Sequence, residues 1–369
     1  MILKVNRSTS ELQLAWCRFL RNRRAVVCLW VLAVLYTGVL FADLIAPYSF
    51  RTEGRDMSYC PPTAVHFFHE GRPQAPFVYG VRLAFDQYHG RVYEIDRSRR
   101  YPLKFFAAGD EYRLFGMVPG RLRLFTVEKP GRIYLLGADS RGRDVFSRIV
   151  YGGQVSLTIG LVGVAISFTI GLLVGGVAGY FGGRLDDVLM RLCEMVMMVP
   201  GFYLLLALRA ALPDNLTSLQ VYCAIIVILS FIGWAGLARV IRGMCLSLRE
   251  RDYVLVARTL GVSQGRIILT HILPHTVSYS IAAVMLSIPG YILGESALSM
   301  IGLGIQDPYA SWGNMLSEAM SIVRIQFAPW IMWPAFFIFI SIACFNVVGD
   351  ALRDVLDPLV QGREDGDGR

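Results

Sequence analysis

Few residues in this sequence could perform chemistry within a membrane or in an active site. Asp43, Glu194, Arg209 and Glu295 are ionisable and lie in or beside apolar stretches, where such groups often mark an ion or substrate pathway. The first three fall at the ends of those stretches, where a long side chain can also reach water. Glu295 is expected near the outer surface. Both interpretations stay open at this stage.

The sequence contains none of the common enzyme motifs. It has no GxxxxGK[ST] phosphate loop, no HExxH motif and no plausible Ser/His/Asp grouping. His66, His69 and His89 are close in sequence, but histidines without a cysteine or carboxylate partner are a weak metal signature. The seven cysteines show no CxxC spacing. We therefore expect a non-enzymatic chain with no catalytic residues, cofactor or metal.

The composition indicates a membrane protein. Apolar residues make up 54% of the 369 residues and charged residues only 17%, whereas soluble domains carry about 25% charged residues. Those values exclude an ordinary soluble enzyme, a disordered chain and a disulfide scaffold. The missing charge must be concentrated between long apolar runs.

Six apolar runs are long enough to cross a bilayer, which takes about 20 residues. They are residues 25–46, 155–180, 195–212 (with Pro200 expected to bend it), 216–238, 276–293 and 325–349. The first run is too long for a signal-peptide core and is read as an uncleaved anchor. The predicted fold class is an all-α polytopic membrane protein with six transmembrane helices, in which residues 155–349 form the transmembrane core.

Basic residues in the short loops predict the orientation, because Lys and Arg resist translocation. Residues 1–24, 181–194, 239–275 and the tail 350–369 together carry 17 of them, whereas the opposite short loops hold only Arg324. Both termini and the 239–275 loop are therefore expected in the cytoplasm. The net charge of +8 then follows largely from topology, and no DNA-reading motif indicates a nucleic-acid partner.

Residues 47–154 are expected outside as a β-rich extracytoplasmic insertion after the first helix. The stretch 121–127 alternates apolar and polar residues with period two, and Gly and Pro separate several shorter extended runs. A structureless loop of this length would be improbable in a compact protein. Cys60 is its only cysteine, so no disulfide within the insertion can stabilise it.

The cytoplasmic loop 239–275 contains a helix–glycine–helix pattern. Residues 253–260 repeat like two helical turns, and Gly261 can adopt the left-handed conformation that ends a helix. Ser263 suits the N-cap of a second helix, which we expect to end at Pro274. The pattern fits either a plain connector or a docking segment for a partner protein.

This loop resembles the EAA loop of the membrane subunits of ABC-type importers. Ala257, Gly261, Leu273 and Pro274 match that pattern by spacing, while Leu255 and Val256 stand where the pattern has Glu and Ala. The resemblance implies that residues 253–261 insert into a groove of an ATPase subunit. The expected coupling residues are Tyr253, Ala257, Arg258, Gly261, Leu273 and Pro274.

Three further blocks, 136–152, 294–315 and 349–358, are similar to the C-type permease of dipeptide/oligopeptide (peptide/nickel) importers. The resemblance implies half of a translocation pore in a bacterial inner membrane, working by alternating access. It implies as partners a second permease, two cytoplasmic ATPases that hydrolyse ATP, an extracytoplasmic substrate-binding protein and a peptide substrate, besides membrane lipid. Alternatives are nickel or another small solute as cargo, an ion-coupled secondary transporter or channel, and a membrane scaffold without transport.

Gly171, Gly175 and Gly179 recur every four residues in the second run. Small residues on one helix face permit close approach of a neighbouring helix. That neighbour can belong to the same subunit or to a partner permease, and Gly160 and Gly163 could extend the same face.

Overall fold

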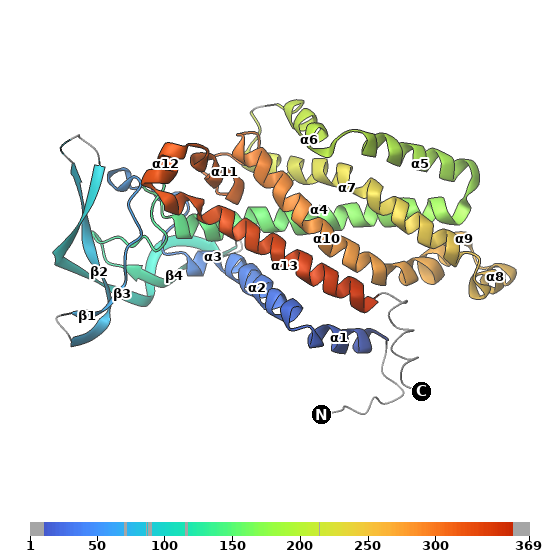
Figure 1. Ribbon diagram of the computed structural model, residues 1–369, viewed down its shortest axis with the longest axis horizontal. Helices are drawn as coiled ribbons and strands as arrows, with labels where there is room; N and C mark the ends of the chain where they lie inside the picture. The colour runs from blue at the N-terminus through green and yellow to red at the C-terminus, as the bar shows by residue number, and fades with distance from the viewer. Residues whose placement is uncertain are drawn as a thin grey trace.

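The computed structural model describes residues 11–69, 72–85, 87, 91–114, 117–213 and 215–356. Residues 1–10 of the expected N-terminal segment, residues 357–369 of the expected tail and His89 lie outside the described residues. Figure 1 shows a long bundle of helices with a small sheet at one end.

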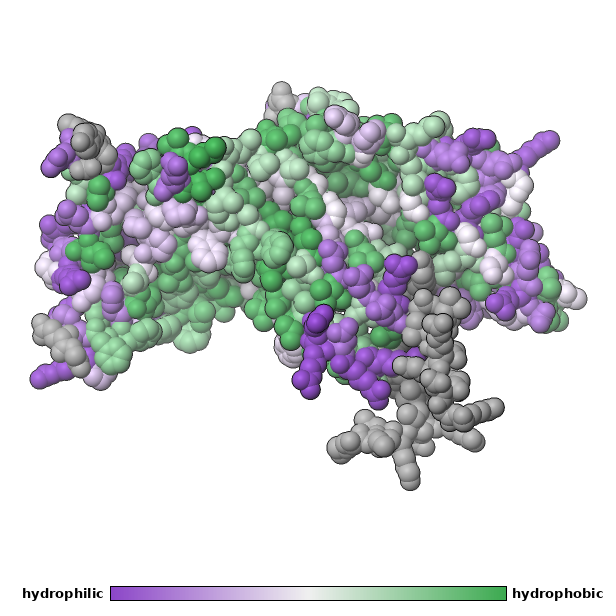
Figure 2. Space-filling view, in the orientation of Figure 1, coloured by the Kyte–Doolittle hydropathy of each residue, from purple (hydrophilic) through white to green (hydrophobic). Residues whose placement is uncertain are grey.

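Long apolar helices form the bundle, because a helix satisfies every backbone hydrogen bond within its own segment. Within the described part of the chain, five helices are long and apolar enough to cross a membrane, or up to six if one bent pair of helices is a single span. The helices of the bundle are α2 (Arg23–Leu40), α4 (Val145–Phe181), α5 (Gly183–Met198), α6 (Gly201–Ala210), α7 (Ser218–Leu248), α10 (Leu273–Met300) and α13 (Trp333–Leu356). Figure 2 shows apolar side chains over the middle of this bundle and polar side chains gathered at both ends.

The expected span 195–212 is not one straight helix. α5 ends at Met198, Pro200 precedes α6, and the two helices are bent by 85° at this break. Pro200 explains the break, because proline lacks a backbone N–H and biases the preceding Val199 away from helical geometry. The charged residues of 181–194, expected in a loop, belong to α5.

Several other helices extend beyond the apolar runs that predicted them. α4 begins ten residues before the expected span, and α7 continues through Leu248 into the segment expected as a loop. A charged pair accompanies this extension. The Arg242 guanidinium donates to both carboxylate oxygens of Asp186 at 2.7 and 2.5 Å, which links α7 to α5.

Shorter elements connect and flank the long helices. They are α1 (Glu11–Arg21), α3 (Ala42–Ile45), η1 (Arg55–Met57), α8 (Asp252–Thr259), α9 (Gln264–Ile267), the π-helical turn η2 (Ile268–Ile272), α11 (Trp312–Leu316), η3 (Ser317–Met320), α12 (Ile322–Phe327) and η4 (Pro329–Met332). In Figure 1, α1, α8, α9 and the C-terminal end of α13 lie toward the end of the bundle away from the sheet.

The described part of residues 47–144 holds a four-stranded antiparallel sheet in the order β1-β2-β3-β4. The strands are β1 (His66–His69), β2 (Arg72–Phe85), β3 (Arg91–Leu114) and β4 (Val118–Val127). The long β3 pairs with β2 through its first half and with β4 through its second half. Strand β4 covers the period-two alternation of residues 121–127.

A small apolar core and one buried arginine attach the sheet to the bundle. Val78, Phe125, Val127 and Ile133 form that core, with Phe146 of α4 packed against it. Arg123 of β4 is fully buried, and its guanidinium donates to the carbonyl oxygen of Ala46 at 2.8 Å. The sheet is therefore fixed to the ends of α3 and α4.

Candidate functional site

The segment between α7 and α10 contains two short helices joined by a tight glycine turn. α8 ends at Thr259, and Gly261 has φ of +73°. The amide of Gly261 donates to the Arg258 carbonyl at 3.0 Å and that of Val262 to the Ala257 carbonyl at 3.1 Å. These bonds form a Schellman motif, in which glycine is favoured because it adopts positive φ without strain.

The second helix of this segment differs from the expectation in two ways. Ser263 stands at the N-cap of α9, but its side chain makes no capping hydrogen bond. Pro274 does not end the helix. The chain runs from α9 through the π-helical η2 into α10, with Pro274 in the first turn of α10, where a missing N–H costs little.

Burial divides the expected coupling residues into two groups. Ala257 and Leu273 are only 5% and 4% exposed, and they pack with Val254, Ile267 and Ile272. The expectation that the Ala257 side chain faces a partner is therefore wrong, because it faces the chain's own helices. The other four expected coupling residues are exposed: Tyr253, Arg258, Gly261 and Pro274. The neighbouring Leu255, Val256 and Leu260 are exposed as well.

Aromatic and cationic contacts hold α8 against the bundle. The Arg258 guanidinium lies 4.7 Å from the centre of the Tyr180 ring, and its Nε donates to the Tyr180 hydroxyl at 3.2 Å. The ring of Tyr253 lies 5.5 Å from that of His275 at the start of α10. α8 thus contacts α4 and α10, so a force on α8 would be transmitted to both.

The glycine face of α4 packs against α7 of the same chain. A Cβ atom on Gly175 would lie 2.4 Å from the Ala238 carbonyl oxygen, and one on Gly179 would lie 2.6 Å from that of Arg242. At Gly171 the corresponding distance to the Trp234 carbonyl is 3.1 Å. Gly160 and Gly163 instead face Ile288 and Tyr291 of α10. Two glycine faces therefore pack α4 against two neighbours.

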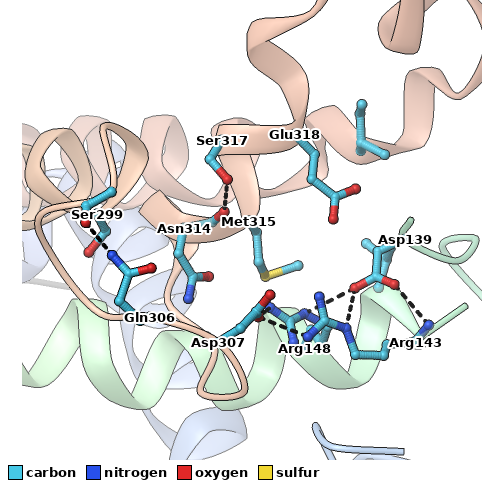
Figure 3. Close-up of a pocket in the computed structure, with 13 residues that line it drawn as sticks. Asp139, Arg143, Arg148, Ser299, Gln306, Asp307, Asn314, Met315, Ser317 and Glu318 are labelled. Carbon is cyan, nitrogen blue, oxygen red and sulfur yellow. Dashed lines mark hydrogen bonds and ion pairs between the residues drawn. The ribbon is translucent and has the colours of Figure 1, made fainter. Parts of the chain in front are cut away.

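A buried cluster of charges lies at the opposite end of the bundle (Figure 3). Arg143 and Arg148, both 3% exposed at the side chain, point toward Asp139 and Asp307. Arg143 donates to Asp139 at 2.6 Å and to Asp307 at 2.8 Å, and Arg148 lies 3.3 Å from Asp307. This cluster ties the segment after α10 to the beginning of α4.

Glu318 of η3 adds a second connection between the same segments. Its carboxylate accepts hydrogen bonds from the Ser140 hydroxyl at 2.6 Å and the Ser140 amide at 3.2 Å. Burial raises the pKa of Glu318 above its ordinary value, although the Ser140 bonds favour the charged form. At Asp307, burial acts in the same direction, but Arg143 and its neighbours outweigh it and lower the pKa.

Glu295 lies in the last turns of α10. It is fully buried, and its carboxylate accepts hydrogen bonds from Ser156 at 2.8 Å and Ser299 at 2.7 Å. The chain after α10 folds back over this site and buries it. Ser311 and Trp312 of that returning chain are buried beside Ser156, whose hydroxyl accepts the Trp312 amide.

The other three ionisable candidates do not join Glu295. Asp43 accepts a hydrogen bond from the Tyr151 hydroxyl at 2.8 Å. Arg209 is buried and donates to the Leu303 carbonyl at 2.6 Å, whereas Glu194 pairs with Arg191 at the surface of α5. Sequence reasoning also missed the cluster of Arg143, Arg148 and Asp307. The alternation of Asp and Arg across 139–148 was its only local signal.

Comparison with known proteins assigns the fold to a family. Residues 171–362 match the family model described as binding-protein-dependent transport system inner membrane component. Residues 10–62 match the N-terminal TM domain of oligopeptide transport permease C. The chain belongs to the family of binding-protein-dependent transport system inner membrane components. It is therefore a multi-pass membrane component of a transport system.

Curated relatives narrow the class to permease proteins. The dipeptide transport system permease protein DppC of Bacillus subtilis (strain 168) is 40% identical over 229 residues, which cover 62% of this chain and 70% of that protein. The oligopeptide transport system permease protein OppC of Haemophilus influenzae is 38% identical, covering 61% and 70%. The glutathione transport system permease protein GsiD of Pectobacterium atrosepticum is 38% identical, covering 63% and 74%.

Proposed function

We propose that this chain is one of two permease subunits that form the translocation pathway of an ATP-driven importer of short peptides. The single observation that carries the proposal is the family match over residues 171–362, which includes the helix–glycine–helix segment and, from the charged cluster at the other end of the bundle, Asp307 and Glu318. The relatives' names, which refer to dipeptide, oligopeptide and glutathione transport, support peptide as cargo.

In this proposal the exposed surface of α8 and the following turn docks into an ATPase subunit. Leu255, Val256 and Leu260 are 46%, 56% and 77% exposed, and such apolar side chains at one end of a bundle favour contact with another protein. Tyr253, Arg258, Gly261 and Pro274 contribute to this surface or to its shape. Ala257 and Leu273 contribute from the inside, since they anchor α8 to α7 and α10.

Docking at α8 gives a route for alternating access. Movement of the ATPases on binding ATP would pull α8, and α8 would shift α4 and α10 through Tyr180 and His275. At the end of the bundle near the sheet, breaking or forming the ion pairs of Asp307 would change access to the pathway from outside. Switching between two packed arrangements of helices is a common form of such transitions.

The membrane arrangement follows from the same proposal. The bent pair α5 and α6 counts as the sixth span, both termini and α8 face the cytoplasm, and the sheet faces the outside. A substrate-binding protein would deliver cargo at the sheet end, and a second permease would complete the pathway. The 17-to-1 distribution of basic residues in the short loops supports this orientation.

Uptake in whole cells tests the cargo. A strain lacking this chain should fail to accumulate labelled dialanine or trialanine, and the plasmid-borne gene should restore accumulation while ⁶³Ni²⁺ uptake stays unchanged. Loss of nickel uptake with normal peptide uptake would identify a permease for nickel instead. Normal uptake of both would contradict the proposed cargo.

A further inference from the structure

A large cavity lies where the outer sheet meets the chain segments leading into the bundle. Its volume is about 870 Å³, within the range of about 300–1,000 Å³ typical of small-molecule sites. Residues of four segments line it: 47–52, 104–110, 126–134 and 142–144. The cavity is separate from the charged cluster around Asp307, and of its lining residues only Pro47, Tyr48 and Thr52 fall within a matched family region.

The cavity wall carries charges of both signs. Lys104 and Glu128 form an ion pair with each other. The remaining charged lining residues are Asp110, Asp144, Lys129 and Arg132, and no ion pair found among the described residues joins any of these four to another. Two carboxylates and two cations thus remain for a ligand that carries both charges.

Asp144 is the most deeply placed of these charges. It is 3% exposed, and its Oδ2 accepts hydrogen bonds from the amide and hydroxyl of Ser147 at 2.8 and 2.6 Å. Its Oδ1 is buried and has no hydrogen-bond partner within the described chain. Leaving a buried carboxylate oxygen without a hydrogen-bond partner costs free energy of folding. A buried acid with a strongly raised pKa beside a cavity is a common feature of functional sites.

Two basic residues, Lys129 and Arg132, line the same cavity. Lys129 is exposed and Arg132 is half-buried; the Arg132 guanidinium donates to the Tyr134 hydroxyl at 3.2 Å. Arginine and lysine are the usual partners of carboxylates. A ligand with an ammonium group at one end and a carboxylate at the other would match both sets of charges.

We propose that this cavity binds a small zwitterion, an amino acid or short peptide, with its ammonium group at Asp144 and its carboxylate at Lys129 and Arg132. Oδ1 of Asp144 is buried, so binding requires the cavity lining to shift and expose this oxygen to the ammonium group. The site holds cargo outside the membrane before translocation. That role rests on the proposed function, whereas binding itself does not.

Calorimetry on the full-length chain in lipid nanodiscs tests the proposal with dialanine, N-acetyl-dialanine and dialanine amide as probes. Removing either charge from the ligand should weaken binding by about tenfold or more, as expected for the loss of a charge-assisted hydrogen bond. Asp144→Asn should bind the free and acetylated forms equally, because asparagine retains the helix cap but lacks the charge. The double variant Lys129→Gln/Arg132→Gln should lose discrimination against the amide, while Arg91→Gln, outside the cavity, should behave as wild type.

Equal affinity of the wild type for all three probes, or no binding at millimolar concentration, would refute the site. The probe series on the wild type and the surface variants decide the matter even if Asp144→Asn fails to fold. Peptide uptake by cells with no dialanine binding here would leave the proposed function standing and overturn only this site. Dialanine binding with the predicted discrimination, but without peptide uptake by cells, would support this site and contradict the proposed function.

Discussion

At the scale of single residues, Gly261 determines the shape of the segment between α8 and α9. Its φ of +73° strains any residue with a Cβ atom, and a Cβ there would meet no neighbour within 4 Å, so backbone strain is the main effect of a substitution. We expect Gly261→Val to lose ~1 kcal/mol or more of local stability. The variant protein should still insert into the membrane, but the amount of ATPase that copurifies with it and the peptide uptake by cells should fall sharply.

Gly265 in α9 offers a matched control, because a Cβ there also meets nothing within 4 Å and its φ is ordinary. Gly265→Val should therefore keep ATPase copurification near the wild-type level. Similar losses in both variants would show that bulk at this surface matters and that the positive φ of Gly261 does not.

Asp144 makes stability depend on pH. Burial raises its pKa from an ordinary value of 3.8 to about 7, despite the opposing hydrogen bonds from Ser147. As the pH rises, the folded protein therefore releases this proton at a higher pH than the unfolded chain does. The resulting stability is fully present below pH 4 and is lost as the pH rises through 7, by up to about 4 kcal/mol.

The variant Asp144→Asn isolates this effect, because asparagine caps a helix as well as aspartate. Its unfolding temperature in detergent, relative to the wild type, should rise between pH 5 and pH 8. Asp139, whose charge acts on Asp144, and the other charged residues of the cavity lining (Arg132, Lys104, Lys129, Asp110 and Glu128) remain unchanged in this comparison. A difference independent of pH would contradict the assigned titration.

At the scale of elements, the packing of α4 on α7 depends on glycine. Gly175→Ala would place a Cβ 2.4 Å from the Ala238 carbonyl oxygen, so the helices must move apart, at a cost of ~1–3 kcal/mol. Gly236→Ala in α7 is the matched control, because a Cβ there meets nothing within 4 Å. That variant should be neutral or stabilising by ~0.5–1 kcal/mol.

Thermal unfolding of the purified variants in detergent measures both effects. Gly175→Ala should lower the unfolding temperature, whereas Gly236→Ala should not. If the two variants unfold alike, the close approach of α4 and α7 does not contribute to stability.

Elements defined by local pattern could be predicted from the sequence. The apolar runs indicated helices α2, α4, α7, α10 and α13, and the alternation at 121–127 indicated the extended chain of β4. Gly261 likewise has the positive φ that its position between two helical patterns suggested. Each of these depends on residues close together in the chain.

Features that depend on distant segments could not be predicted. Glu295 is buried because residues 301–312 fold back over it, and nothing in the residues beside it signals that cover. Ala257 faces inward because of how α8 packs on α7 and η2, whereas its spacing in the pattern fits either face. Pro274 fits both the end and the first turn of a helix, and the structure uses it in the first turn.

At the scale of the whole molecule, the orientation predicts which ends can be labelled from outside. Cys60 is fully buried, and burial raises the pKa of its thiol to about 12, so it is a poor reporter. Ser98 and Ser263 are exposed at opposite ends. In a background with Cys17→Ser and Cys223→Ser, Ser98→Cys should react with an impermeant thiol reagent in intact cells, and Ser263→Cys only after lysis. The reverse pattern would overturn the orientation.

The buried Glu295 bears on how transport is energised. It is fully buried, and ionisable groups buried in a membrane protein often mark an ion pathway. Its serine partners satisfy the buried carboxylate. A transport measurement distinguishes a proton gradient from ATP as the driving force.

The most direct test is peptide accumulation in proteoliposomes that contain this chain, its partner permease and both ATPases. The substrate-binding protein is added on the side of the membrane that the sheet faces. We predict dialanine or trialanine uptake that requires ATP on the ATPase side, persists when the proton gradient is collapsed, and is abolished by Leu260→Glu, which places a charge on the exposed docking surface. Leu269→Glu, exposed elsewhere on the same segment, should retain uptake. Accumulation driven by a proton gradient without ATP, or full ATP-driven uptake by Leu260→Glu, would contradict the account.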